Sequence, residues 1–239
     1  YTTEGEWYQL YQIGFGGIPG KPSGDGPDGH SLWPSFTNVP NEFLECNFPL
    51  RIENYVTLPD TGGPGTHRGG NALRISYGFL EDGEISIHDD RWLTYPWGVN
   101  GGQPGKRSTK IMVRADGTEE LMDSKRDRIK VKAGDVLHFD TWGGGGWGKP
   151  YERDAEKVQK DVERGLVTKE GAKRYGVVLN DDFSIDKAAT DELRSEMAAA
   201  ANGNTEIFNR GGTIEQLKAL CLEQTGMPPP EQPQFQVRV

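Results

Sequence analysis

Four consecutive glycines occupy positions 143–146, between Trp142 and Trp147. A stretch without side chains cannot fill a hydrophobic core, but its backbone reaches conformations, including positive φ, that other residues avoid. Two interpretations stay open. Either the run is an irregular connection that brings main chain close to another surface, or its amides line a site for an anion. The substrate- or phosphate-binding candidates of the second interpretation are Gly143, Gly144, Gly145 and Gly146.

The glycine run also divides the chain by secondary structure. Before it, short apolar–polar alternations are separated by glycine-rich turns, which is typical of antiparallel strands. After it, apolar residues recur at helical spacing. The sequence therefore predicts an α+β fold: a barrel- or sandwich-like β-rich body with Gly-rich loops, followed by a C-terminal helical region. The expected boundaries are 1–148 for the β-rich body, 149–227 for the helices and 228–239 for an extended proline-rich tail.

Residues 16–47 are too rich in Gly, Pro, Asp and Asn for a helix or a central strand, so a long loop is expected there. Loops of that length in a compact protein tend to be functional or to pack on a neighbour. Its polar candidates, Asp25, Asp28 and His30, lack the close spacing of a metal site. We expect a loop that is solvated or lies between subunits.

Local capping signals place the expected helices. Asp154 is a candidate N-cap and Gly165 a candidate C′ residue for a first helix. An alanine-rich helix over 185–201 has few apolar anchors and is expected at the surface. Residues 213–226 begin with a Thr-x-x-Gln capping box, and Cys221 falls on the apolar face of that helix.

Two clusters of side chains are candidates for chemistry, and the first lies in a glycine-rich turn. His67 and Arg68 are flanked there by glycines on both sides. A guanidinium can hold a carboxylate or phosphate through two parallel hydrogen bonds, so both residues are candidates for binding substrate or phosphate. A structural ion pair of Arg68 is the alternative.

The second cluster is the densest titratable one in the chain: His88, Asp89, Asp90 and Arg91. It follows a half-buried strand in which Ile87 and His88 point to opposite faces. A histidine beside carboxylates is typical of general acid–base sites, so these four residues are our catalytic candidates. Alternatively, an Asp–Arg pair at the strand end only pins the following loop.

The 239 residues carry a net charge of −9, and the pI is near 5.0. Because no basic patch stands out, nucleic acid and anionic membranes are not expected as partners. No apolar run approaches the roughly 20 residues that span a bilayer, and no secretory signal is recognisable, so a cytoplasmic protein is expected. Cys46 and Cys221 lie in unrelated segments without metal-ligand spacing, so we expect reduced thiols and no metal site.

Several spaced motifs resemble those of the hydantoinase B family, which includes one half of 5-oxoprolinase and subunits of acetone and acetophenone carboxylases. The passage GGGGWGKPYERD, continued by DVERGLVTKEGAKRYGVVL, is similar to the family's closing signature. Three earlier passages agree in the same order: NEFLECNFPLRIENYVTLPDTGGPGTHRGGNALRISYGF, DRWLTYPWGVNGGQPGKRS and RIKVKAGDVLHFDT. Since several motifs coincide over residues 13–179, the resemblance is more specific than one glycine pattern.

The resemblance implies a hetero-oligomeric, ATP-dependent enzyme. In such an enzyme ATP and Mg are held by a hydantoinase A-type partner, which phosphorylates a carbonyl oxygen, and the B-type subunit hosts the following step. The N-terminal half of the B-type subunit carries a His-Leu-Pro-Asp stretch associated with a divalent metal. This sequence has no such stretch and no initiator methionine, so we expect the C-terminal part of a longer subunit, without a cofactor of its own.

Three functions stay open. The first is hydrolysis of a cyclic amide such as a lactam, hydantoin or oxoproline, which we favour because ring-opening members form the broader group. The second is biotin-independent carboxylation of a ketone, and the third is a purely structural assembly element. The expected partners are a small-molecule substrate, a hydantoinase A-type subunit, and the missing N-terminal part of the same polypeptide. The isolated chain is expected to be inactive.

Overall fold

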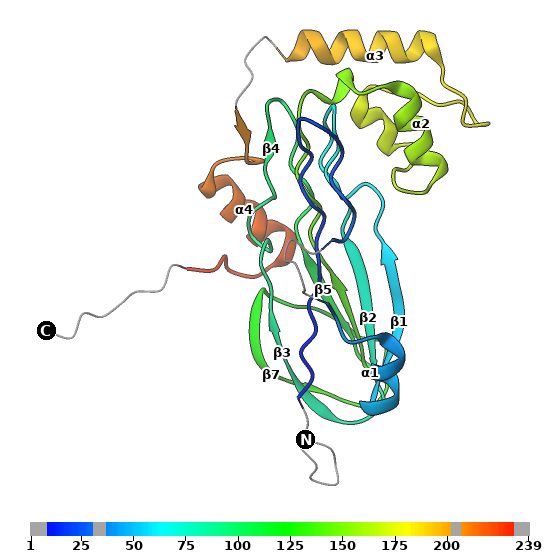
Figure 1. Ribbon diagram of the computed structural model, residues 1–239. Coiled ribbons are helices and arrows are strands. Elements are labelled where there is room, and N and C mark those ends of the chain that lie inside the picture. The colour runs from blue at the N-terminus through cyan, green and yellow to red at the C-terminus, as the bar shows by residue number, and fades with distance from the viewer. Residues whose placement is uncertain (1–8, 31–36, 202–206, 232–239) are drawn as a thin grey trace, which may run out of the picture.

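The computed structural model describes residues 9–30, 37–201 and 207–231. The chain forms an elongated body with strands at one end and most helices at the other (Figure 1). In chain order the elements are α1 (Asn41–Asn47), β1 (Leu50–Thr57), β2 (Leu73–Phe79), β3 (Gly83–His88), β4 (Gly98–Val99), β5 (Thr109–Val113), β6 (Glu119–Leu121), β7 (Lys125–Val131), β8 (Val136–Asp140), the 3-10 helix η1 (Pro150–Glu152), α2 (Ala155–Glu163), the 3-10 helix η2 (Gly171–Tyr175), α3 (Lys187–Ala200), β9 (Phe208–Asn209) and α4 (Ile214–Thr225).

The β-rich body consists of antiparallel sheets. Five strands form the main sheet in the order β1-β2-β8-β5-β6, and the pairs β3-β7 and β4-β9 form two-stranded ribbons. The register of β2 and β8 places Tyr77 opposite Leu137 and Ile75 opposite Phe139. The strands of the described residues close no barrel, so the barrel alternative is wrong, while the α+β class with antiparallel sheets and C-terminal helices is confirmed.

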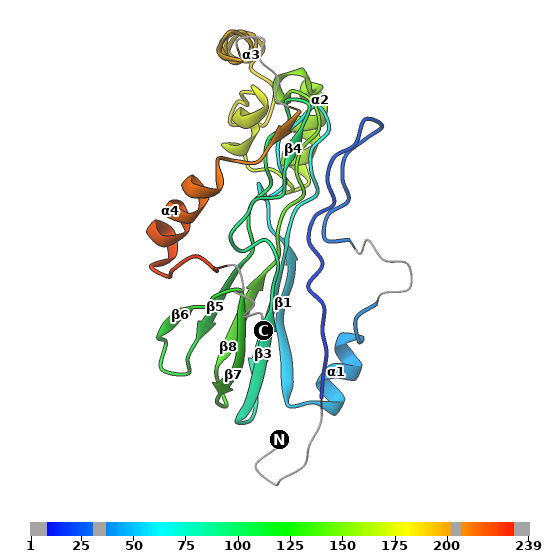
Figure 2. The same cartoon turned by 90° about the vertical axis from the view of Figure 1, so that its left-hand side faces the viewer.

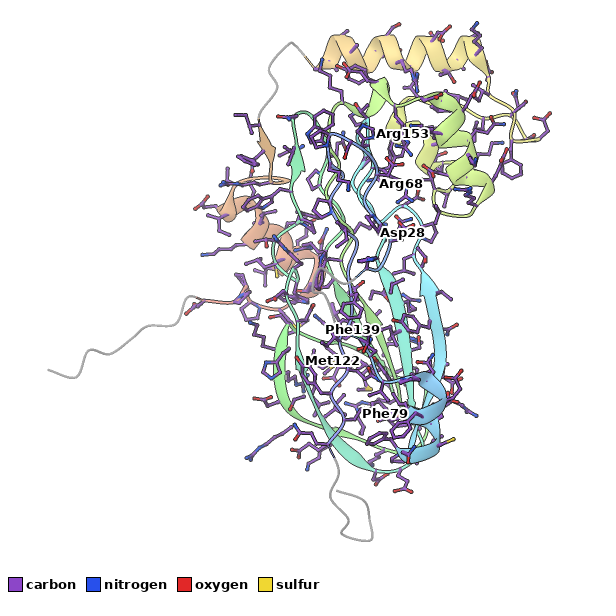
Figure 3. All side chains as sticks on the ribbon, in the orientation of Figure 1. Asp28, Arg68, Phe79, Met122, Phe139 and Arg153 are labelled. Atoms are coloured by element: carbon purple, nitrogen blue, oxygen red, sulfur yellow. The ribbon has the colours of Figure 1, made fainter. Side chains whose placement is uncertain are left out.

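A hydrophobic core joins the main sheet to the β3-β7 ribbon. Alternate residues of each strand point to it, which is why β3 buries Ile87 while His88 is exposed. Figure 3 marks Phe79, Met122 and Phe139 in this region. The buried members are Phe79, Ile87, Met112, Met122, Ile129, Val131 and Leu137, with Phe139 and Tyr77 packed against them.

The predicted long loop over 16–47 is wrong in one part, because α1 occupies Asn41–Asn47. This helix buries Leu44 completely and lies beside β1 (Figure 2). Its N-cap residue is Pro40, which has no side-chain cap. A helix this short, without a capping signal, leaves little trace in the sequence, and its stability comes from packing on the sheet.

The helices α2 and α4 have the capping residues that the sequence predicts. The Asp154 carboxylate accepts from the Glu156 amide at 3.0 Å, and Gly165 has a φ of 70° after α2. Thr213 and Gln216 form both halves of a capping box at α4. Cys221 is fully buried, while Cys46 is exposed, and both thiols are free.

A second core forms among α2, η2 and the segment that follows η2. Val158 and Val162 of α2 face Ala172 and Tyr175 of η2 in this cluster, together with Val177. The helix α3 contributes much less, since Thr190 is its one buried residue. The Ala-rich helix is therefore at the surface, as its few apolar anchors predict.

Candidate functional site

Five extended, glycine-rich segments connect the strand end to the helical end, and we call them the glycine bundle: residues 14–20, 24–29, 61–71, 97–106 and 142–148. They run side by side along the body (Figures 1 and 2). Main-chain hydrogen bonds join them, among them Gly17 N to Trp142 O at 2.7 Å, Gly70 N to Ile18 O at 2.8 Å, Gly63 N to Gly144 O at 2.8 Å and Val99 N to Gly146 O at 2.9 Å.

The four-glycine run lies inside this bundle. A Cβ atom at Gly144 would lie 2.2 Å from the Ile18 carbonyl oxygen, so only glycine permits this backbone approach. Three of the four amides donate to neighbouring carbonyl groups: Gly143 to Lys106 at 3.0 Å, Gly144 to Gly70 at 2.8 Å and Gly146 to Gln103 at 2.9 Å. These contacts match the interpretation as close main-chain packing. An anion site at Gly143, Gly144, Gly145 and Gly146 stays a prediction, with three of its donors already engaged.

A buried ion-pair network joins the glycine bundle to α2. The Arg153 side chain is 1% exposed and donates to both carboxylate oxygens of Asp25, at 2.6 and 2.8 Å, and to Asp161 at 2.8 Å. Arg68 donates to both oxygens of Asp28 at 2.7 and 3.2 Å, and its Nε lies 3.5 Å from Asp161. Figure 3 shows Asp28, Arg68 and Arg153 along this junction.

The charges in this network stabilise one another. Burial opposes ionisation of Asp25, but hydrogen bonds and charge from Arg153 and Arg68 outweigh it, and the pKa of that carboxyl lies below its usual value. Burial likewise opposes the charge on Arg68, and Asp28 and Asp161 outweigh it, so its pKa is raised. Arg68 therefore has the structural ion pair of the alternative interpretation.

The sequence indicates one member of this network, the buried Asp161 of α2. Asp161 lies between Val158 and Val162 on the apolar stripe of α2, and a charged residue in such a position needs a buried partner. The identity of that partner has no local signal, because Arg68 and Arg153 come from other parts of the chain. Asp25 and Asp28, expected in a solvated or inter-subunit loop, are the partners of these arginines.

His67 lies next to this network and remains accessible. Its side chain is 21% exposed, and its Nδ1 is 3.8 Å from the Asp25 carboxylate. Its ring centroid is 5.8 Å from that of Trp147, and the two backbones exchange hydrogen bonds of 3.0 and 2.9 Å. Of the predicted pair His67 and Arg68, only the histidine keeps a side chain that a ligand can reach.

The four catalytic candidates at the end of β3 point in different directions. The His88 side chain is 67% exposed, with Nε2 3.3 Å from Asp127, and Asp90 is 84% exposed, 3.9 Å from Lys125. The Arg91 guanidinium lies 6.0 Å from the Trp97 ring centroid. The predicted Asp–Arg pair is therefore wrong, because among the described residues Asp89 pairs with Lys110 and Asp90 lies nearest Lys125.

The ion pair that fixes this strand end is formed by Asp89 and Lys110. Both side chains are buried, and the Lys110 ammonium and the Ser108 hydroxyl donate to the same Asp89 oxygen. Burial raises the pKa of Asp89 and lowers that of Lys110, while each charge favours the ionised form of the other. Ser108 also donates to the Asp90 carbonyl at 3.1 Å, so the cluster fixes the start of the following loop.

Two further properties concern cofactors and membranes. Within residues 9–30, 37–201 and 207–231, no group of three or more His, Cys, Asp or Glu side chains is arranged to hold a metal ion. No helix in the same ranges is both long and apolar enough to cross a bilayer. The candidate site thus consists of the ion pairs of Arg68, Arg153 and Lys110, the partly exposed His67, and the main-chain groups of the glycine bundle.

Curated sequences resemble this chain over much of its length. A putative D-/L-hydantoinase B-type chain of Pseudomonas sp. (strain NS671) is 36% identical over 198 residues, which cover 81% of this chain and 33% of that protein. The acetophenone carboxylase delta subunit of Aromatoleum aromaticum is 26% identical over 247 residues, covering 90% of this chain and 36% of the relative. The chain thus spans about a third of the length of these relatives.

Solved structures share the fold. The ATP-dependent caprolactamase from Pseudomonas jessenii superposes with a TM-score of 0.61 at 25% identity, over 75% of this chain and 32% of the other. The nucleotide-free structure of acetone carboxylase gives a TM-score of 0.63 over 85% of this chain and 31% of that one; at 17% identity it shows the fold alone.

The family assignment rests on the sequence. The sequence model described as Hydantoinase B/oxoprolinase matches residues 1–150, which is more than half of the chain. That range includes the glycine bundle and all of the main sheet. The chain belongs to the hydantoinase B/oxoprolinase family.

Proposed function

We propose that this chain is the C-terminal portion of the B-type subunit of an ATP-dependent complex that hydrolyses a cyclic amide: a lactam, a hydantoin or an oxoproline. One observation carries the proposal: 36% identity to a putative hydantoinase B-type chain over 81% of this chain. The caprolactamase, an ATP-dependent lactam hydrolase by its name, supports it through a fold match over 75% of the chain.

The proposed reaction explains why such a complex needs ATP. An amide carbon is a poor electrophile because its nitrogen donates electron density to the carbonyl group. ATP, with Mg in a hydantoinase A-type partner subunit, supplies a phosphoryl group to the amide oxygen, which makes the carbon electrophilic enough for water to add. The ring C–N bond then breaks with protonation of the nitrogen, and a second water releases the phosphoryl group as inorganic phosphate. A divalent metal belongs, on this proposal, to the N-terminal part of the same subunit, and this chain binds none.

The part played by this chain is mainly to position groups. The Arg153 and Arg68 ion pairs hold the helical end against the glycine bundle, so the bundle presents a fixed main-chain surface. His88, Asp90 and Arg91 are exposed and stay our candidates for contact with substrate or with other chains. Asp89, which is paired with buried Lys110, is better suited to positioning them.

The second candidate function is ATP-dependent, biotin-independent carboxylation of a ketone. The acetophenone carboxylase delta subunit supports it, since that match covers 90% of this chain, more than the hydantoinase relative covers. The third candidate, a purely structural assembly element, is supported by the engagement of Arg68, Asp89 and three bundle amides in internal contacts.

An assay of the assembled complex distinguishes these functions. ATP is supplied with 5-oxoproline, hydantoin or caprolactam in one series, and with acetone or acetophenone plus bicarbonate in the other. ATP consumption coupled to ring opening is expected, and a carboxylated product would replace the first proposal with the second. The chain alone is expected to show neither activity. If the remaining subunits turn over substrate at an unchanged rate without this chain, the chain takes no part in the chemistry, and the structural function is the one that remains.

A further inference from the structure

A cavity of about 480 Å³ lies where the loop after β1 meets η2 and the bundle residue Lys106. Its volume is within the range of small-molecule sites. Three separate segments build it: the loop around Asp60, the bundle residue Lys106, and the stretch over 168–174. The lining residues are Asp60, Lys106, Thr168, Glu170, Gly171, Lys173 and Arg174.

Both carboxylates in the cavity wall already have partners within the protein. Asp60 accepts from the Thr168 amide at 3.0 Å with one oxygen and from the Thr168 hydroxyl at 2.6 Å with the other. Glu170 pairs with Lys173 at 2.8 Å. The Asp60 carboxylate is therefore turned toward the protein, whereas the Glu170 side chain is 80% exposed beside Lys173.

Two of the three cations, Lys106 and Arg174, are less fully used than Lys173, which pairs with Glu170. Within the described part of the chain, no carboxylate lies at ion-pair distance from the Lys106 ammonium. Arg174 donates one N–H to the Asp60 carbonyl at 2.8 Å, and its remaining N–H groups have no hydrogen-bond partner among the described residues. With Lys173, three cations face two carboxylates in a protein whose overall net charge is −9.

The wall is also rigid. Asp60 has a φ of 62°, in the left-handed region that non-glycine residues avoid and that is concentrated at functional sites. A Cβ atom at Gly171 would lie 1.9 Å from the Asp60 carboxylate, so glycine is needed for this contact. Lys106 is held by its backbone, which donates to Thr61 at 2.8 Å and accepts from Gly143 at 3.0 Å. The backbone around the cavity therefore keeps its place without a ligand.

We propose that this cavity binds a phosphate group, held by Lys106, Lys173 and the free N–H groups of Arg174. A doubly charged oxyanion suits a site with several cations, and a guanidinium fork fits phosphate geometry. The group comes from inorganic phosphate or from a nucleotide. The site does not depend on which reaction the complex performs.

Calorimetric titration of the assembled complex with inorganic phosphate tests the site, with ATP and acetate as further arms. Lys106→Ala is expected to weaken phosphate binding about tenfold, the loss typical of one charge-assisted contact. Lys157→Ala is the matched control, because Lys157 is exposed on α2 and does not line the cavity. The affinity should also fall as ionic strength rises.

A labelling experiment locates the binding on this chain. Acetylation of lysines is followed by mass spectrometry with and without phosphate, and phosphate should slow the labelling of Lys106 and Lys173 while Lys157 is unaffected. Stronger protection by ATP than by phosphate would support the site and identify a nucleotide as the source. Equal affinity in the wild type and Lys106→Ala, equal labelling with and without phosphate, or equally strong binding of acetate would overturn the proposal.

Discussion

Replacing Arg153 with methionine removes the central cation of the network between the glycine bundle and α2. The side chain is 1% exposed and makes three hydrogen bonds of 2.6 to 2.8 Å to Asp25 and Asp161. Methionine keeps most of the volume, so the cost comes from leaving the buried Asp161 and the partly exposed Asp25 without their partner. Breaking a buried pair in this way costs about 3–5 kcal/mol.

That cost is measurable as a melting temperature. For a protein of this size, 1 kcal/mol corresponds to about 2–4 °C, so a drop of about 6–20 °C is expected for Arg153→Met. Lys149→Met is the matched control, because its ion pair with Glu152 is solvent-exposed, with the lysine side chain 39% exposed and the partners 3.3 Å apart. Exposed pairs contribute about 0–1 kcal/mol, so the control should shift by no more than a few degrees.

Hydrogen exchange in the assembled complex shows where the stability is lost. Amides of α2 and η2 should lose protection in Arg153→Met, since the network joins them to the bundle, whereas those of β2 and β8 should not. Adding Asp25→Asn to Arg153→Met should cost less than the sum of the two single changes, because the pair shares one interaction. A Tm equal to that of Lys149→Met, with unchanged exchange, would refute the reasoning.

Three further predictions concern the strand end, the bundle and pH. Asp89→Asn should lower the free energy of unfolding by about 3–5 kcal/mol, because it leaves the buried Lys110 ammonium without its counter-charge. His88→Ala should change that free energy by less than about 0.5 kcal/mol. A denaturant unfolding titration measures both. If His88 is an acid–base group, its loss lowers turnover per assembled complex about 10²–10⁴-fold at full stability, but we expect nearly unchanged turnover. Gly144→Ala should prevent assembly or lower the Tm sharply, because its Cβ would lie 2.2 Å from a carbonyl oxygen, whereas Gly24→Ala, with open space around it, should not; equal melting curves would contradict this. Because the pKa of Asp25 is lowered in the folded state, its contribution is complete above the unfolded value of about 3.9 and is lost as pH falls through the folded value. Asp25→Asn should therefore flatten the acid side of the stability curve, and an unchanged curve would argue against it.

The sequence predicts the local structure well where a pattern repeats over neighbouring residues. The alternation of Ile85 and Ile87 in β3, the Asp154 cap of α2 and the Thr213 capping box are all present. These features depend on residues within one turn or one strand, so the local sequence contains all the information. Pairing of the strands is different, since the order β1-β2-β8-β5-β6 depends on which chain segments meet.

The side-chain clusters show the limit more clearly. His88, Asp89, Asp90 and Arg91 are neighbours in sequence, yet the strand geometry sends Asp89 into the core and leaves His88 and Asp90 in solvent. Conversely, Asp25 and Arg153 form one ion pair across most of the chain length. Density of titratable residues along the sequence is thus a poor measure of density in space.

The glycine bundle has a consequence for the order of folding. Its segments come from residues 14–148 and are joined largely by main-chain hydrogen bonds, and apart from the turn between segments 14–20 and 24–29 these contacts link distant parts of the chain. Bringing distant segments together costs chain entropy before the hydrogen bonds are gained, which makes such contacts slow. We expect the sheet and the α2–η2 pair to form first and to align the segments, and the bundle to close last. In pulse-labelling hydrogen exchange during refolding, the amides of Gly17, Gly70 and Gly144 should then become protected after those of β2 and β8, and in the same kinetic phase as one another.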